Sequence, residues 1–134
     1  MSALTQEMKD AMAKVDLFPF ATASRAGVPN VVPVRYLLIE NDNTLWITDN
    51  FFLKTLTNLA ENPRVALYVY EPDTGVCFQI KGQAEVKTSG ADYERMRDTV
   101  RQKKADLPAK SLVVMRVTEV YECRPGADAG KRLF

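Results

Sequence analysis

The chain has 134 residues, of which 26% are charged, and its formal net charge is +1. This length predicts one domain, residues 1–134, that could bury further surface against a second copy. The near balance of charge excludes the strong basic field of a nucleic-acid-binding protein. No apolar run approaches the roughly 20 residues that span a bilayer, and the charged N-terminal stretch is not an apolar leader. We therefore expect a cytoplasmic protein with no membrane or nucleic-acid partner.

The chain contains no histidine, and its two cysteines, Cys77 and Cys123, are far apart in the sequence. The lack of histidine removes the Ser-His-Asp and Cys-His nucleophile systems and the usual ligand of metals and haem, although haem held by Tyr or Cys stays open. Neither cysteine belongs to a CxxC pair, so free thiols fit better than a zinc site or a redox dithiol. Any chemistry is therefore expected to belong to a bound cofactor, with no catalytic side chain and no metal.

The chain is predicted to start with a helix and a hairpin. Residues 1–15 carry an apolar stripe at helical spacing, and residues 17–24 form a β-compatible run that ends in a turn. Residues 30–40 form a long β-rich run that is apolar on both faces and contains Pro33. Because proline cannot donate to a sheet ladder, Pro33 marks an edge, a bulge or a place where a ligand lies against the backbone. These alternatives stay open.

Residues 45–70 contain the stretch around which the chain is organised. A β-branched and aromatic run predicts a strand, Asp49 and Asn50 predict a turn, and leucines at helical spacing predict a short helix that Pro63 ends. A second strand follows. This order places Lys54 and Thr55 in the first turn of the helix, where unpaired N–H groups and the helix dipole favour an anion. The sequence therefore predicts a phosphate site here, unless these residues only begin a helix.

The second half of the chain repeats this β-rich character. Residues 76–87 alternate regularly as a half-buried strand, and Gly82 within it predicts a sharp bend. Residues 91–104 predict an amphipathic helix with a solvated basic face, and residues 112–123 predict a last strand. Residues 124–134 are expected to form a flexible tail or an arm that folds on contact. The fold class is therefore mainly β with flanking helices, in which six antiparallel strands close into a small barrel.

The sequence resembles the FMN-binding split-barrel family, which includes pyridoxamine 5′-phosphate oxidases and the short FMN-binding proteins. The order and spacing of five motifs fit this family between about residues 17 and 86, and the strand pattern fits to Cys123. The motifs are Pro29-Asn30-Val31-Val32-Pro33-Val34, Trp46-Ile47-Thr48-Asp49-Asn50, Lys54-Thr55-Leu56-Thr57-Asn58-Leu59, Glu61-Asn62-Pro63-Arg64-Val65-Ala66-Leu67 and Gln79-Ile80-Lys81-Gly82.

The resemblance implies a place for each part of FMN. The strand matching Val32, Pro33, Val34 and Arg35 would lie along the flavin ring. The strand end matching Ile47 and Thr48 would reach the ribityl and phosphate region, and the helix start matching Lys54 and Thr55 would hold the phosphate. The resemblance also implies a homodimer with the flavin at the subunit interface, to which residues 76–86 and the C-terminal tail of the second subunit would contribute.

The sequence departs from the true oxidases in three respects. It lacks their C-terminal Arg/His-bearing signature for the pyridoxal substrate, Cys77 falls near their flavin-facing glutamine, and Leu53 stands where a second basic residue often flanks the phosphate lysine. Pyridoxamine phosphate oxidation is therefore not expected. The leading hypothesis is an FMN-binding flavoprotein that acts as a small oxidoreductase or an electron carrier. The alternatives are a non-catalytic module that holds flavin or F420, and a barrel whose site has decayed.

Overall fold

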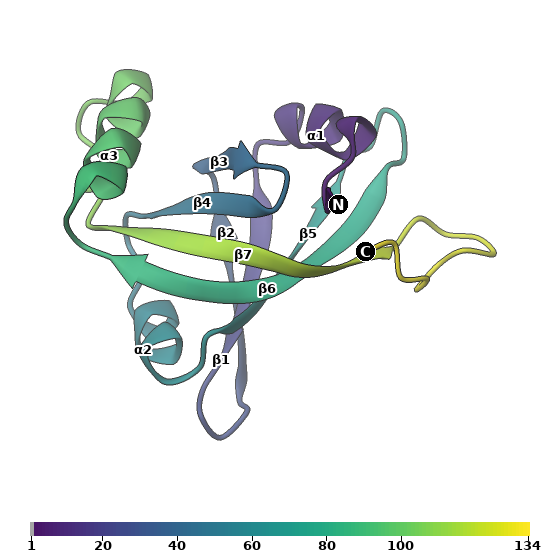
Figure 1. Cartoon of the computed structure of the whole chain (residues 1–134), viewed down its shortest axis with the longest axis horizontal. Helices are drawn as coiled ribbons and strands as arrows, with labels where there is room; N and C mark the ends of the chain where they lie inside the picture. Colours follow the sequence, from purple (N-terminus) through teal and green to yellow (C-terminus); the bar gives the residue numbers. More distant parts are fainter. Residues whose placement is uncertain (1) are drawn as a thin grey trace.

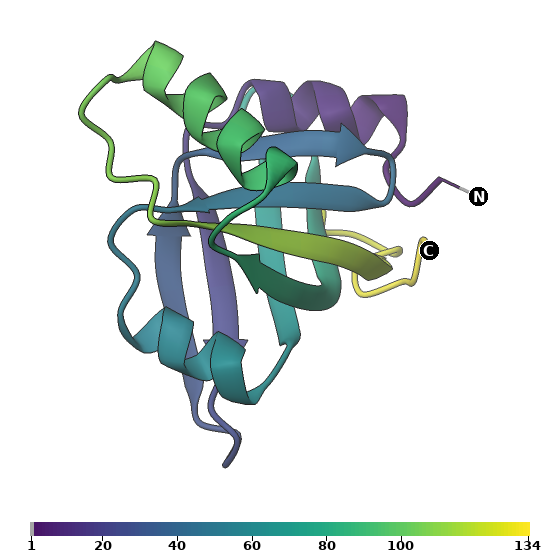
Figure 2. The same ribbon diagram turned by 60° about the vertical axis from the view of Figure 1, so that its left-hand side comes forward.

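A computed structural model describes residues 2–134 and contains one seven-stranded antiparallel sheet with three helices (Figure 1). The strand order in the sheet is β2-β1-β5-β6-β7-β4-β3. The elements in chain order are α1 (Gln6–Ala13), β1 (Phe18–Ala23), β2 (Pro29–Val34), β3 (Leu37–Asn41), β4 (Thr44–Asp49), α2 (Lys54–Glu61), β5 (Arg64–Tyr70), β6 (Cys77–Lys87), α3 (Ala91–Lys103) and β7 (Ser111–Glu122). The sheet is curled, and α2 lies away from α1 and α3 in both views (Figures 1 and 2). The predicted mainly β split-barrel fold is confirmed.

The strand count is seven rather than the predicted six, because the run at residues 30–40 forms two strands. β2 pairs with β1 up to Val34, and β3 pairs with β4 from Leu37. Between them, the carbonyl oxygen of Tyr36 accepts a hydrogen bond from Thr48 N–H at 3.1 Å. β2 and β3 are the two edges of the sheet, so the barrel is open where the chain passes from one to the other. Pro33 therefore lies on an edge strand, where a missing N–H leaves no partner unsatisfied.

The central stretch folds as predicted, with β4, a turn, α2 and β5 following one another directly. α2 begins at Lys54 and ends at Glu61, and Asn62 N–H closes its last turn by donating to Asn58 O at 2.7 Å. The following Pro63 disfavours helical backbone at Asn62, which has extended φ and ψ angles. The helix therefore ends at Glu61, and the extended Asn62 separates it from the proline.

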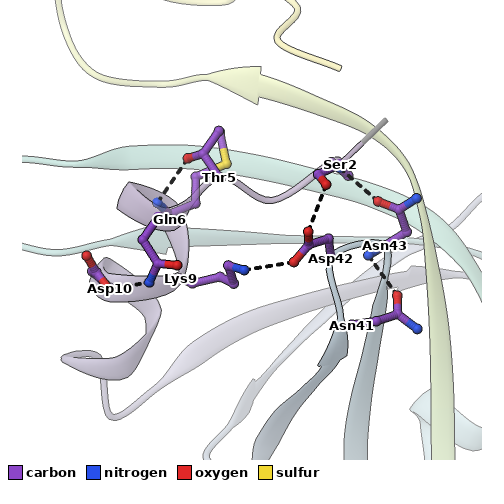
Figure 3. A network of polar contacts seen from close by, with 10 residues as sticks. Ser2, Thr5, Gln6, Lys9, Asp10, Asn41, Asp42 and Asn43 are labelled. Carbon is purple, nitrogen blue, oxygen red and sulfur yellow. Dashed lines mark hydrogen bonds and ion pairs between the residues drawn. The ribbon is translucent and has the colours of Figure 1, made fainter.

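Helix α1 is shorter than the predicted span of residues 1–15, because Thr5 caps it. The Thr5 hydroxyl accepts a hydrogen bond from Met8 N–H at 3.2 Å. Both the segment before the cap and the helix contact the turn between β3 and β4. Asp42 in this turn accepts from the Ser2 hydroxyl at 2.7 Å and from Nζ of Lys9 in α1 at 2.8 Å (Figure 3). These contacts fasten α1 to the rim of the barrel. Residue 1 lies outside the described residues.

The core has two parts. The larger one fills the inside of the curled sheet and includes Phe20, Ile47 and Phe78, each almost fully buried. The smaller one lies under α3 and includes Trp46, whose ring carries the Arg95 guanidinium at 4.2 Å from its centroid. Trp46 and Ile47 are neighbours on β4 and point to opposite faces of the sheet. One face of this strand therefore packs inside the curled sheet, and the other packs under α3.

Gly82 marks the predicted bend in β6. The ladder between β6 and β7 shifts register between Lys81 and Gly82, which is a β-bulge. A Cβ atom at position 82 would overlap the carbonyl oxygen of Arg116, so only glycine lets β7 approach this closely. The bend lets the long strand β6 follow the curl of the sheet while it pairs with β5 and β7.

The last eleven residues fold back along β7. Tyr121 forms a β-bridge with Arg132, and Leu133 N–H donates to Val120 O at 2.7 Å. Phe134 packs against the larger core. The segment therefore extends the sheet beside the part of β7 that β4 does not reach.

Glu71 is a buried carboxylate in the turn between β5 and β6. It accepts hydrogen bonds from the N–H of Asp73 and from the N–H and hydroxyl of Thr74. Burial alone would raise the pKa of Glu71, but these hydrogen bonds outweigh it and hold the pKa below its usual 4.5. The charged form is therefore the one that the turn stabilises.

We expect acid to weaken the fold through Glu71. Because its pKa is lowered on folding, its contribution is fully present above pH 4.5 and is lost as the pH falls through the lower folded-state value. Glu71→Gln should be less stable than the wild type at neutral pH and should lose less stability on acidification. Urea unfolding across this pH range measures both effects, with Glu85→Gln on the exposed face of β6 as the control. Equal pH dependence of the wild type and Glu71→Gln would contradict the assignment.

Candidate functional site

A cleft of about 600 Å³ opens where the barrel is split. Its walls are the end of β2 and the link to β3, the end of β4, and the turn that leads into α2. Seven of the eight residues that the resemblance implied as cofactor ligands line it: Val32, Pro33, Val34, Arg35, Thr48, Lys54 and Thr55. The eighth, Ile47, is fully buried with its side chain in the core. The structure thus brings the sequence motifs to one cavity, and their role in binding stays a prediction.

The start of α2 provides positive potential at the cleft. No side chain caps the helix and its first turn contains no acidic residue. Lys54 and Arg35 are exposed at the cleft, and within residues 2–134 neither forms an ion pair. Unpaired N–H groups, the helix dipole and an unpartnered ammonium all favour an anion here. The helix start is therefore suited to a phosphate group.

A small polar network fixes α2 against the sheet. The Thr22 hydroxyl on β1 accepts hydrogen bonds from the Asn58 side chain at 3.0 Å and the Asn30 side chain at 3.2 Å. Asn30 also donates to the Thr55 hydroxyl at 3.1 Å. Because Thr22, Thr55 and Asn58 are all buried, these bonds are made in a low-dielectric setting and hold the helix start in one position.

The turn before α2 is held by the fully buried side chain of Asp49. Its carboxylate accepts hydrogen bonds from Phe52 N–H at 2.9 Å and from the Ser111 hydroxyl at 2.8 Å. Asn50 reaches the other side of the turn and accepts from Ala109 N–H at 2.9 Å. The turn that the sequence predicted at Asp49 and Asn50 is therefore tied to the segment before β7, and the Asp49 carboxylate is buried within it.

Thr48 carries an unusual hydroxyl. The residue lines the cleft and is 4% exposed, yet its Oγ1 has no hydrogen-bond partner. A buried hydroxyl without a partner costs about 1–3 kcal/mol, so such groups commonly mark a place where a ligand or water completes the bonding. The orphaned hydroxyl and the cationic helix start lie on the same cleft. A molecule that joins a hydroxylated chain to a phosphate matches both.

Several cleft residues were not predicted from the sequence. Phe51 and Leu53 are 81% and 80% exposed at the cleft, although large apolar side chains are usually covered. Lys104, assigned by the sequence to the solvated face of a helix, follows the end of α3 and lines the cleft with Leu107. Phe51 and Leu53 lie within three residues of Lys54 in the sequence, so their place at the cleft could have been predicted from the expected phosphate site. No local pattern indicated that residues after α3 would reach the cleft.

The fold and the cleft define a class of protein, a split barrel with a cleft at the opening of its sheet. A family model described as pyridoxamine 5′-phosphate oxidase matches residues 4–124. The chain belongs to this family.

Two proteins are similar to the chain over nearly its whole length. An uncharacterized protein of Methanocaldococcus jannaschii, MJ0282, is 38% identical over 134 residues, which cover 96% of this chain and 86% of that protein. The crystal structure of HupZ from Group A Streptococcus has a TM-score of 0.82 and is 28% identical, covering 95% of this chain and 99% of that chain.

More distant structures share the fold alone. An FMN-binding protein from Syntrophomonas wolfei has a TM-score of 0.66 and 17% identity, covering 82% of this chain and 78% of that one. HutZ, a heme storage protein from Vibrio cholerae, has a TM-score of 0.68 and 14% identity, covering 89% of this chain and 94% of that one. Because the same fold carries different ligands, the ligand has to be inferred from the residues of the cleft.

We expect opposite effects from removing the two buried hydroxyls of Thr48 and Thr22, each 4% exposed. In protein without a bound ligand, Thr48→Val should raise the free energy of unfolding by about 1 kcal/mol because it removes an unpaired polar group. Thr22→Val should lower it by about 1–3 kcal/mol because two side-chain amides lose their acceptor. Urea unfolding measures both. A loss of stability in Thr48→Val equal to that in Thr22→Val would show that the Thr48 hydroxyl has a partner.

Proposed function

We propose that this protein binds FMN in the cleft at the opening of the barrel and acts as a small flavin-dependent oxidoreductase or electron carrier. The observation that carries the proposal is the pairing of the uncapped start of α2, with its free Lys54, and the unpartnered Thr48 hydroxyl on one cleft. Membership of the pyridoxamine 5′-phosphate oxidase family and the fold shared with an FMN-binding protein support it.

The residues of the cleft fit the three parts of FMN. Lys54, Thr55 and the first N–H groups of α2 would hold the phosphate, with Arg35 as a second cation. The Thr48 hydroxyl would bond the ribityl or phosphate region, while Ile47 has only main-chain atoms to offer. The edge strand at Val32 and Pro33 would lie along the ring and exclude water from one face. When bound, the flavin supplies the transfer of one or two electrons.

The protein side of the reaction is expected to be limited to binding and orientation. The charged or phenolic residues that line the cleft are Arg35, Tyr36, Lys54 and Lys104, and none of the described lining residues is Asp, Glu, His or Cys. The lining therefore offers no carboxylate or imidazole as a general base. Asp49, a carboxylate in the turn before α2, is engaged by Phe52, Ser111 and Lys110. This favours cofactor chemistry over chemistry of protein side chains. A module that holds flavin or F420 without turnover would use the same cleft.

We further infer that the protein is a homodimer with the cleft at the subunit interface. The outward face of β2, β1 and β5 is formed largely by apolar residues, and Val31 lies opposite Ala21, which lies opposite Ala66. Val31, Tyr68 and Tyr70 on this face are exposed, as are Phe51 and Leu53 at the cleft. An apolar face this continuous is typical of an interface. Sedimentation of purified protein as a strict monomer would argue against it.

The location of the protein is part of the same proposal. Within residues 2–134, no helix is both long enough and apolar enough to cross a membrane. A cytoplasmic location is proposed because both cysteines are free thiols, as a reducing compartment favours.

The visible spectrum of the purified protein tests the proposal directly. Flavin absorption, with FMN released on denaturation and identified by mass, supports it, and bleaching by NAD(P)H supports an enzyme over a carrier. Released F420 would support the alternative ligand, and a haem spectrum would overturn the choice of flavin. A colourless protein that binds no added FMN would indicate a decayed site.

Lys54→Ala is expected to weaken FMN binding by about 10- to 100-fold, because a charge-assisted hydrogen bond contributes roughly 1.5–3 kcal/mol. Binding of riboflavin, which has no phosphate, should change little. Fluorescence titration of the flavin-free protein with both ligands measures the difference.

The control is Lys14→Ala, which removes an exposed lysine after α1 that does not line the cleft. It should leave both affinities unchanged. Equal losses of FMN and riboflavin in Lys54→Ala would place the phosphate elsewhere.

A further inference from the structure

The fold brings the two cysteines together although 45 residues separate them in the sequence. Cys77 begins β6 and Cys123 directly follows β7, and the ladder aligns Phe78 with Glu122, so the cysteines occupy the next register position. The Cys123 N–H donates to the Cys77 carbonyl oxygen at 2.9 Å. The Cys123 thiol donates to the Tyr121 carbonyl oxygen at 3.9 Å. Their separation in the sequence argued against a dithiol, but the fold places the two cysteines opposite each other.

The position suits a disulfide. Opposite residues that share main-chain hydrogen bonds in an antiparallel pair lie about 5.5 Å apart at Cα, and disulfides join Cα atoms about 4.4–6.8 Å apart. Both are free thiols, and no cleft-lining residue comes from β6 or β7. The register therefore places the two Cα atoms in the range that a disulfide joins, and neither cysteine lines the cleft of its own subunit.

We propose that Cys77 and Cys123 form a reversible redox pair that exchanges with low-molecular-weight disulfides such as oxidised glutathione. In the first step one protein thiolate attacks the small disulfide, forming a mixed disulfide and releasing one small thiol. In the second step the other protein thiolate attacks the protein sulfur of that mixed disulfide and releases the second small thiol. Two protein thiols are oxidised to one disulfide, and one small disulfide is reduced to two thiols.

The surroundings assign the order of attack. Cys123 is exposed and Cys77 is half-buried, so Cys123 meets the small disulfide first. Burial raises the pKa of both thiols, and the Glu122 carboxylate raises it further. The Arg124 guanidinium lowers the pKa of Cys77. On the other side of β6, the residue of β5 that pairs with Cys77 is Tyr70. Cys123 is therefore the attacking thiol and Cys77 the resolving one.

The bridge would act on the C-terminal segment. Residue 123 is the last before the chain turns at 124–130 and returns along β7, where Gly130 N–H donates to Glu122 O at 2.7 Å. A covalent link to β6 would fix the point at which this return begins. Oxidation would thus stabilise the end of β7 and the segment paired with it.

The experiment exposes purified protein to oxidised glutathione at mildly alkaline pH, where more thiolate is present. In the wild type we expect the loss of two thiols per chain, a mass lower by two hydrogens, and a peptide that links Cys77 to Cys123 after proteolysis. Added dithiothreitol should restore both thiols. The linked peptide depends on no variant, so the test does not rely on a mutant that folds.

Cys77→Ser and Cys123→Ser are the matched variants. Cys77→Ser keeps the attacking thiol but not the resolving one, so its glutathione adduct should exceed that of the wild type by about tenfold or more, because a neighbouring thiol acts at a millimolar or higher effective concentration. Cys123→Ser should react more slowly than Cys77→Ser. A wild type that keeps a glutathione adduct, stays fully reduced or forms disulfides only between chains would overturn the proposal.

Discussion

The structure depends on one constraint: the curled sheet does not close. β2 and β3 are its two edges, and they are consecutive in the chain. An open edge leaves main-chain groups without sheet partners and is covered in most proteins by a side chain, a loop, a ligand or a second chain. Here Pro33 removes one donor from the β2 edge, and the Tyr36 carbonyl oxygen is bonded by Thr48 N–H. The opening that remains between these two edges is the cleft. The position of the site therefore follows from the incomplete closure of the barrel.

Hydrogen bonds within the protein hold the polar groups around the cleft in place, independently of any ligand. Asp49 holds the turn, and Thr22 and Asn30 hold the start of α2, with each of these side chains bonded to partners from distant segments. Two groups at the cleft, the Thr48 hydroxyl and the Lys54 ammonium, have no partner among residues 2–134. Preorganised donors of this kind bind a ligand without the cost of ordering the site. The unpartnered hydroxyl and ammonium are therefore the groups of the cleft that remain available to a ligand.

The sequence predicted local features well and distant contacts poorly. The bounds of α2 followed from leucine spacing and Pro63, and the bend at Gly82 followed from a glycine within an alternating strand, since both depend on neighbours in the chain. The break between β2 and β3 was missed because the run is apolar on both faces and gives no period change at residue 35. The contacts of Lys104 and the pairing of Cys77 with Cys123 depend on topology, which no local pattern records. The motifs did predict seven residues that meet at the cleft, because they lie on elements adjacent in the chain.

Trp46 has a consequence for how the cleft can be observed. It is the chain's one tryptophan, it is buried beneath the Arg95 guanidinium, and it lies on β4 two positions before Thr48. An indole so close to the opening is an internal optical probe: a yellow chromophore seated there would absorb its emission by resonance energy transfer. The quenching of a single, well-defined emitter would report occupancy of the barrel in real time without any attached label.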